Sequence, residues 1–89
     1  MRIDLFLKWS RVVARRSLAK ATCDAGRVEV NGKVVRAGYQ VAVGDLVVLD
    51  LANRILKARV LALPFRAPDK VESRKMIEIQ ENVRKRGDG

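Results

Sequence analysis

The chain has 89 residues, which is enough for one small domain. It carries 19 Lys and Arg against 10 Asp and Glu, and the net charge of +9 favours a polyanionic partner such as nucleic acid. A hydrophobic content of 48% excludes a disordered basic tail, while one cysteine and no histidine exclude an internal disulfide and a zinc site.

The basic residues gather in the first third of the chain. Residues 1–36 hold nine basic and three acidic side chains, residues 37–63 hold three and two, and residues 64–89 hold seven and five. We therefore expect a surface for a polyanion to be built mainly from residues 1–36.

Helical spacing of apolar residues predicts a first helix over residues 2–13, with Phe6 and Trp9 on its core side. Asp4 lies in the first turn, where a carboxylate suits the helix dipole. Lys8, Arg11 and Arg15 would share one narrow sector if the helix ran as far as Arg15. The pattern indicates an amphipathic helix with a basic edge, although an ordinary solvated face has the same pattern.

The segment Arg15-Arg16-Ser17 precedes a second predicted helix, Leu18 to Ala25, which Gly26 ends. Ser17 is a good N-cap residue because its hydroxyl accepts a hydrogen bond from the first turn. Two arginines at the positive end of a helix dipole are unfavourable by roughly 0.3–1 kcal/mol each. We therefore expect an anion, most simply a phosphate group, at this helix start. Cys23 is expected on the inner side of the helix as a small apolar residue without chemistry.

The pattern then changes to period two. Residues 27–30 and 33–36 flank Asn31-Gly32, a preferred pair for a type I′ hairpin. Gly44-Asp45 is a turn signal in which Asp45 is a structural acceptor, and residues 46–51 and 55–63 are predicted to form a second antiparallel pair.

The sequence of the C-terminal part is compatible with two alternative secondary structures. Residues 71–83 are compatible with a short charged helix, and residues 76–79 with an edge strand. Residues 84–89 are predicted to form a mobile basic tail that attracts phosphates nonspecifically.

The sequence does not favour an enzyme. Its ten carboxylates are scattered, and it contains no phosphate-binding glycine loop and no nucleophile motif. We expect no catalytic residue, no metal and no cofactor.

The order of helix, basic loop, capped helix and Asn-Gly hairpin resembles the S4-type RNA-binding domain. The matching segments cover about half of the chain: Arg2-Ile3-Asp4 with Phe6-Leu7, Arg11, Arg16-Ser17-Leu18-Ala19, 26–32, and Gly44-Asp45. The resemblance implies an α+β fold with two N-terminal helices packed on a small, mainly antiparallel sheet, the S4-type αL fold. We expect the domain over residues 1–63 and a C-terminal extension with a basic tail over residues 64–89.

Size, the start at Arg2 and the short charged tail look most like small stand-alone bacterial proteins of the RqcP type, which are related to the small heat-shock ribosome-binding protein. This resemblance implies binding to ribosomal RNA of the large subunit and to tRNA during ribosome-associated quality control. The partner would be a stalled ribosome complex with a nascent-chain tailing factor. We expect a cytoplasmic monomer that does not bind membranes.

We define the basic rim as the set of cations expected along the two helices: Arg2, Lys8, Arg11, Arg15, Arg16 and Lys20. Arg16 and Ser17 match the family motif and are expected to make the closest phosphate contacts. Arg11 would bridge from the first helix, Lys20 would follow one turn later, and Arg2 would anchor another phosphate. Such a surface should recognise the shape of folded RNA more than its bases. Tyr39 is the one aromatic ring expected to be exposed, which disfavours a single-strand binding module.

Three alternatives stay open beside the quality-control role. The first is a structural ribosome-assembly factor, and the second is a heat-shock-type protein bound to ribosomal RNA. The third, a membrane-surface or peptide-binding chaperone domain, lacks the wide exposed apolar face that an interfacial helix needs.

Overall fold

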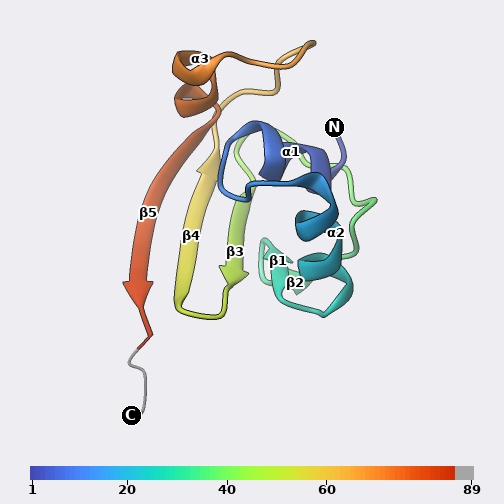
Figure 1. Cartoon of the computed structure of the whole chain (residues 1–89), viewed down its shortest axis with the longest axis vertical. Coiled ribbons are helices and arrows are strands. Elements are labelled where there is room, and N and C mark those ends of the chain that lie inside the picture. The colour runs from blue at the N-terminus through green and yellow to red at the C-terminus, as the bar shows by residue number, and fades with distance from the viewer. Residues whose placement is uncertain (86–89) are drawn as a thin grey trace.

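A computed structural model describes residues 1–85 and shows two helices packed on a sheet, with a third helix at one end (Figure 1). The helices are α1 (Ile3–Trp9), α2 (Arg16–Asp24) and α3 (Lys70–Lys75). The strands are β1 (Val28–Val30), β2 (Lys33–Val34), β3 (Leu46–Asp50), β4 (Arg54–Val60) and β5 (Ile77–Arg84). The predicted α+β class is confirmed.

The sheet is antiparallel throughout, in the order β2-β1-β3-β4-β5. The predicted hairpin is confirmed, because Asn31 and Gly32 have φ angles of 51° and 85° and Val30 pairs with Lys33. The predicted second pair is β3–β4. The Asn31 side chain links the β1–β2 turn to the start of β3. Its Oδ1 accepts from the Leu46 amide at 2.9 Å, and its Nδ2 donates to Asp45 Oδ1 at 3.1 Å.

The first helix is shorter than predicted. It ends at Trp9, with Ser10 as C-cap, and Arg11 then takes a left-handed conformation with φ 63°. The β-branched residues Val12 and Val13 disfavour continuation of the helix. Val13 is buried in the core before α2 begins. The predicted sector shared by Lys8, Arg11 and Arg15 therefore does not exist, because Arg11 and Arg15 lie outside the helix.

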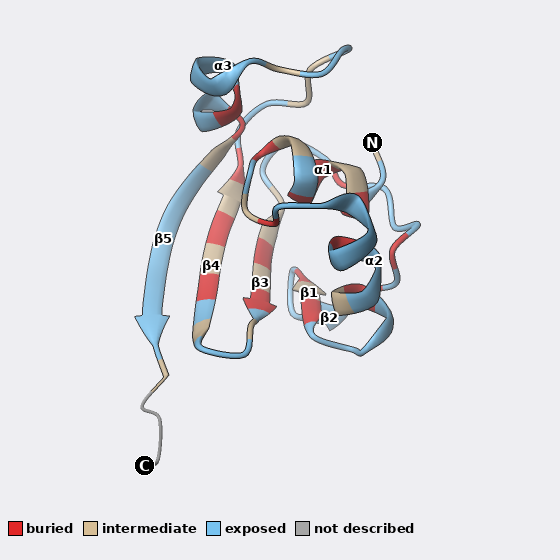
Figure 2. Ribbon diagram, in the orientation of Figure 1, coloured by how far each residue is buried: buried red, intermediate tan, exposed pale blue. Residues whose placement is uncertain are grey.

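The core lies between α1, α2 and the inner face of the sheet. Phe6, Leu7, Val47 and Leu49 are fully buried, and Ala19 and Cys23 are the buried residues of α2. The predicted places of Phe6 and Cys23 are thus confirmed. Figure 2 shows that the buried residues alternate along β3 and β4, as expected for strands with one covered face.

The C-terminal segment contains both structures that the sequence left open. Asp69 caps α3 in a capping box with Glu72, and β5 then pairs with β4 as an exposed edge strand. The predicted division at residues 63 and 64 falls in the segment between β4 and α3, and Met76 from beyond it is buried in the core. The tail prediction is wrong for Arg84 and Lys85, because Arg84 ends β5 and Lys85 forms an ion pair with Asp50. The remainder of the predicted tail, residues 86–89, lies outside the described residues.

Within residues 1–85, no helix has the length and apolar character needed to cross a bilayer. The same residues contain no cluster of three or more His, Cys, Asp or Glu side chains placed to hold a metal ion.

Candidate nucleic-acid interface

Asp4 is a buried carboxylate that holds two arginines at the surface. Its side chain is 3% exposed and accepts two hydrogen bonds from Arg2, from Nε and Nη2, each at 3.2 Å. Arg16 Nη2 lies 3.5 Å from Asp4 Oδ1. The Arg2 and Arg16 side chains are 46% and 48% exposed, so each keeps donors free for an external ligand. We call Arg2 and Arg16 the anchored pair.

The pKa of Asp4 is lowered from its ordinary value of 3.8. Burial raises this pKa, but the hydrogen bonds from Arg2 and the Leu5 amide, together with the charge and hydrogen bond of Arg16, outweigh burial. Asp4 is therefore ionised at neutral pH. One carboxylate against two guanidinium groups leaves the cluster with an excess positive charge.

The backbone around Asp4 is fixed by a second segment of the chain. The Ile3 and Asp4 amides donate to the Tyr39 and Ala37 carbonyl oxygens at 2.7 and 3.3 Å. Arg2 itself forms an isolated antiparallel bridge with Gln40. Arg2 and the Asp4 carboxylate that holds Arg16 thus project from a hydrogen-bonded backbone, which reduces the entropy lost when a ligand binds.

The helix start beside the anchored pair differs from the prediction. Arg15 is the N-cap residue of α2, with φ −137° and ψ 146°, and its carbonyl oxygen accepts from the Ala19 amide at 3.1 Å. The prediction that Ser17 caps the helix is wrong, because Arg16 already lies in the first turn, where its side chain reaches Asp4. No side chain caps the first turn of α2 within the described residues. Its amide groups are consequently available to an anion, with the positive end of the dipole behind them.

The predicted end of α2 is confirmed. Gly26 has φ 76°, its amide donates to the Cys23 carbonyl at 2.9 Å, and the Arg27 amide donates to the Thr22 carbonyl at 3.2 Å. These two bonds form a Schellman motif. The chain then enters β1, while the opposite, N-terminal end of α2 lies beside α1, where Arg16 contacts Asp4.

Comparison with known proteins identifies the family. Residues 1–47 match the model of the S4 domain, and these residues include α1, α2, the Asn31-Gly32 hairpin and the anchored pair. The chain belongs to the S4 domain family. It is 43% identical over 60 residues to an RQC P-site tRNA stabilizing factor of Halalkalibacterium halodurans, covering 67% of this chain and 68% of the relative.

Two solved structures share the S4 fold of this chain. Heat Shock Protein 15 of Vibrio cholerae, solved as a trimer, matches with a TM-score of 0.80 at 20% identity, covering 89% of this chain and 80% of that chain. A hypothetical protein, HP1423, solved in solution, matches with a TM-score of 0.76 at 32% identity, covering 91% of this chain and 98% of that chain. The similarity at 20% identity concerns the fold alone.

The other rim residues lie on the two helices or in the turn that joins them. Lys8 lies in the last turn of α1, and Arg15, Ser17 and Lys20 are exposed at or near the start of α2. Lys20 follows Arg16 by one helical turn, so the two cations lie on the same side of α2. All seven predicted RNA-binding residues are exposed: Arg2, Lys8, Arg11, Arg15, Arg16, Ser17 and Lys20.

Arg11 lies in the turn after α1 and not, as predicted, in the first helix, while its phosphate contact stays a prediction. Its Nε donates to the Ser73 hydroxyl at 3.4 Å, which ties the turn after α1 to α3. No local sequence pattern predicts this contact, since the two residues are 62 positions apart. The anchoring role of Asp4 was also not predicted from the sequence, although a separation of two residues from Arg2 is compatible with an ion pair between them.

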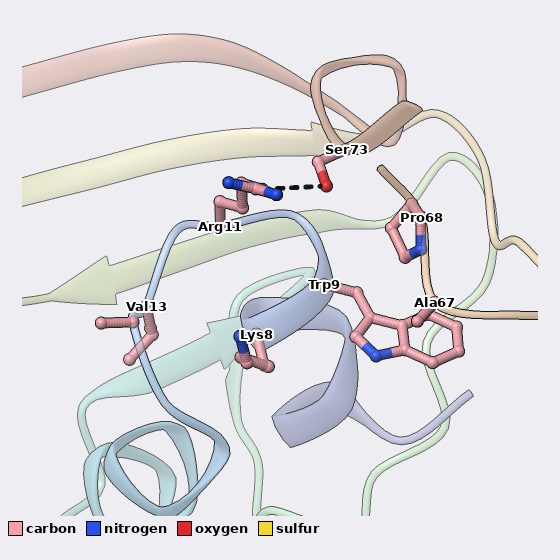
Figure 3. Close-up of a pocket in the computed structure, with 8 residues that line it drawn as sticks. Lys8, Trp9, Arg11, Val13, Ala67, Pro68 and Ser73 are labelled. Carbon is pink, nitrogen blue, oxygen red and sulfur yellow. Dashed lines mark hydrogen bonds between the residues drawn. The ribbon is translucent and has the colours of Figure 1, made fainter. Parts of the chain in front are cut away.

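The aromatic residues of this S4 protein only partly follow prediction. Tyr39 is 39% exposed, as expected, and Trp9 is half-buried, with its indole lining a cavity (Figure 3). The expectation that Tyr39 is the one exposed ring is wrong, because Phe65 is fully exposed in the segment between β4 and α3. Pro64 and Pro68 lie within that segment and remove two backbone donors, which explains why it does not continue the sheet.

Proposed function

We propose that this chain binds folded RNA through the basic rim, with the anchored pair at its centre, and acts in ribosome-associated quality control. The observation that carries the proposal is the buried Asp4 carboxylate, which positions Arg2 and Arg16 beside an uncapped helix start. Guanidinium groups and free backbone amides at a helix N-terminus are donors that suit phosphate oxygens. The relative from Halalkalibacterium halodurans is named for stabilising P-site tRNA, which supports tRNA as one RNA partner.

The proposed binding partners are large-subunit ribosomal RNA and a tRNA whose nascent chain has stalled. The rim belongs to two helices and a loop, and its cations contact phosphates without an exposed row of aromatic rings. Such a surface reads backbone geometry and 2′-hydroxyl groups, and therefore favours a structured RNA over a single strand. The role would be to hold the tRNA while a tailing factor extends the stalled peptide in the cytoplasm. The protein would act as a monomer and without catalysis.

The salt dependence of RNA binding tests the electrostatic part of the proposal. If about five to seven phosphates are neutralised, the logarithm of the affinity should fall with the logarithm of the salt concentration at a slope of roughly −3 to −6. The measurement uses the full chain and a structured ribosomal RNA stem-loop. A slope near zero would contradict an interface built from the rim.

Ultraviolet crosslinking of the cellular protein tests the biological part. Sequencing of the attached RNA should return both large-subunit ribosomal RNA and tRNA. In sedimentation, the protein should follow large subunits that carry peptidyl-tRNA. Crosslinks confined to precursor ribosomal RNA, with sedimentation on precursor subunits, would instead establish the assembly-factor alternative.

A further inference from the structure

A cavity of about 420 Å³ lies between the C-terminal end of α1 and the segment that leads into α3 (Figure 3). Its volume falls within the range of about 300–1,000 Å³ that is usual for small-ligand sites. Part of its wall comes from Ala67, Pro68 and Ser73, which lie beyond the residues 1–47 matched by the S4 model. The cavity is therefore built jointly by the S4 domain and the C-terminal segment. We call it the Trp9 pocket.

The lining of the Trp9 pocket combines an aromatic ring with two cations. The indole of Trp9 lies near Ala67 and Pro68 in Figure 3, while Lys8 and Arg11 supply the charges. None of the described residues that line the pocket is a carboxylate. An aromatic face stacks on a nucleobase, and nearby cations bind its phosphate. The chemistry of this lining thus fits a nucleotide.

Arg11 is held in place on the wall of this pocket. Its φ of 63° lies in the left-handed region, which is uncommon for a residue with a side chain. Its Nε donates to the hydroxyl of Ser73, which is 1% exposed, as the dashed line in Figure 3 shows. Because Ser73 engages Nε, the terminal amino groups of Arg11 stay available to an anion. Strained backbone that is fixed by distant contacts is a feature of binding sites.

We propose that the Trp9 pocket binds one unpaired nucleotide of the RNA partner. Its base would stack on the Trp9 indole, and its phosphate would contact Lys8 and Arg11. This inference rests on the proposed RNA-binding function for the source of the nucleotide, since a free mononucleotide has the same chemistry. It adds a local requirement for an unpaired base, because the remaining rim residues would contact the backbone of paired RNA and would not distinguish an RNA with an extruded base.

Trp9 is the one tryptophan of the chain, so its fluorescence reports on this pocket directly. The full chain is titrated with adenosine monophosphate and, separately, with inorganic phosphate. We expect saturable quenching by adenosine monophosphate with a Kd of about 1 mM or tighter. Inorganic phosphate should produce no comparable quenching, because it has no base to stack.

The variant Lys8→Gln tests the pocket without removing its reporter. Lys8 is exposed in the last turn of α1, so the exchange should preserve the fold. We expect it to weaken adenosine monophosphate binding about 10-fold, as the loss of one phosphate contact implies. Arg36→Gln removes an exposed cation outside the pocket and should leave the titration unchanged. Absence of saturable quenching in the native chain would refute nucleotide binding in the Trp9 pocket. Equal quenching in Lys8→Gln and Arg36→Gln would refute it as well.

Two hairpin RNAs identify the source of the nucleotide. They share one stem, and one of them carries a single unpaired adenosine within it. The native chain should bind the bulged hairpin about 10-fold more tightly than the paired hairpin, and Trp9→Leu should abolish this difference. Equal binding of both hairpins, combined with quenching by adenosine monophosphate, would assign the pocket to a free nucleotide and refute the RNA source.

Failure of the two proposals gives different results. If neither hairpin binds, the proposed RNA-binding function is wrong, and the mononucleotide titration still decides whether the pocket exists. If the paired hairpin binds with the expected salt dependence but no quenching by adenosine monophosphate occurs, the function stands and the Trp9 pocket is refuted.

Discussion

The buried carboxylate of Asp4 and the guanidinium group of Arg16 are linked at 3.5 Å across a separation of 12 residues. This contact joins the first turn of α1 to the first turn of α2. It explains why a cation occupies the positive end of the α2 dipole, since a fixed anion lies beside it. The same carboxylate also holds Arg2, so one buried charge orients two arginines toward solvent.

Replacement of Arg16 by alanine should weaken RNA binding. The variant loses one charge-assisted phosphate contact, so we expect an affinity loss of about 10-fold and a salt slope flatter by about one unit. The fold should persist, because the Arg16 side chain is about half exposed and Arg2 still pairs with Asp4. Filter binding over a salt series measures both effects. Arg36→Ala is the matched control, and unchanged affinity in a folded Arg16→Ala variant would refute the assignment.

Asp4 should contribute to stability in a pH-dependent way. Its pKa is lowered in the folded state, so the contribution is complete above the ordinary value of 3.8 and is lost as the pH falls through the lower folded value. Asp4→Asn cannot lose this contribution at low pH. Urea unfolding between neutral and acidic pH should therefore show a shallower decline in the free energy of unfolding for Asp4→Asn than for the native chain. Parallel declines would contradict the role of this carboxylate.

Asp4→Asn should also weaken RNA binding although it raises the net positive charge. The neutral amide no longer orients two guanidinium groups, and the loss of preorganisation outweighs the removal of one negative charge near the RNA. We expect an affinity loss of several-fold at physiological salt. Tighter binding by a folded Asp4→Asn variant would show that net charge matters more than the anchored geometry.

Cys23 should resist thiol reagents in the native protein. It is 2% exposed, and burial, followed by the charges of Asp4 and Asp24, raises its pKa from 9.0 to about 11. The thiolate fraction near neutral pH is thereby reduced about 100-fold before steric protection is counted. Native protein should react slowly with a disulfide reagent and rapidly once unfolded in guanidinium chloride. Rapid modification of the folded chain would contradict the structural role.

Asn31 should be the most sensitive residue of the β1–β2 turn. Asn31→Ala removes both side-chain hydrogen bonds to the Leu46 and Asp45 region and places alanine at φ 51°. The expected loss in the free energy of unfolding is about 1–3 kcal/mol. Chemical denaturation measures this loss. Lys33→Ala, an exposed neighbour, should change stability by less than about 0.5 kcal/mol.

Local sequence signals predicted the elements well where neighbouring residues determine them. The Asn31-Gly32 turn and the Gly26 helix end follow from backbone preferences of single residues, and both are confirmed. Prediction of the helix starts and ends was weaker. Ser17 had the right side chain for a cap, but the helix starts two residues earlier, where Arg16 contacts Asp4.

The sequence by itself determined the positive charge, its concentration in residues 1–36, and the succession of helices, hairpin and strands, because charge and local propensity belong to individual residues and their neighbours. Only the tertiary structure decided which charges act together. Asp4 accepts a hydrogen bond from Arg16, and Arg11 donates one to Ser73. Both contacts join segments that are separate in the chain, so no local sequence pattern encodes them. The buried position of Asp4 is likewise a property of the packed core, and it is this burial that turns a helix-start carboxylate into the anchor of two arginines.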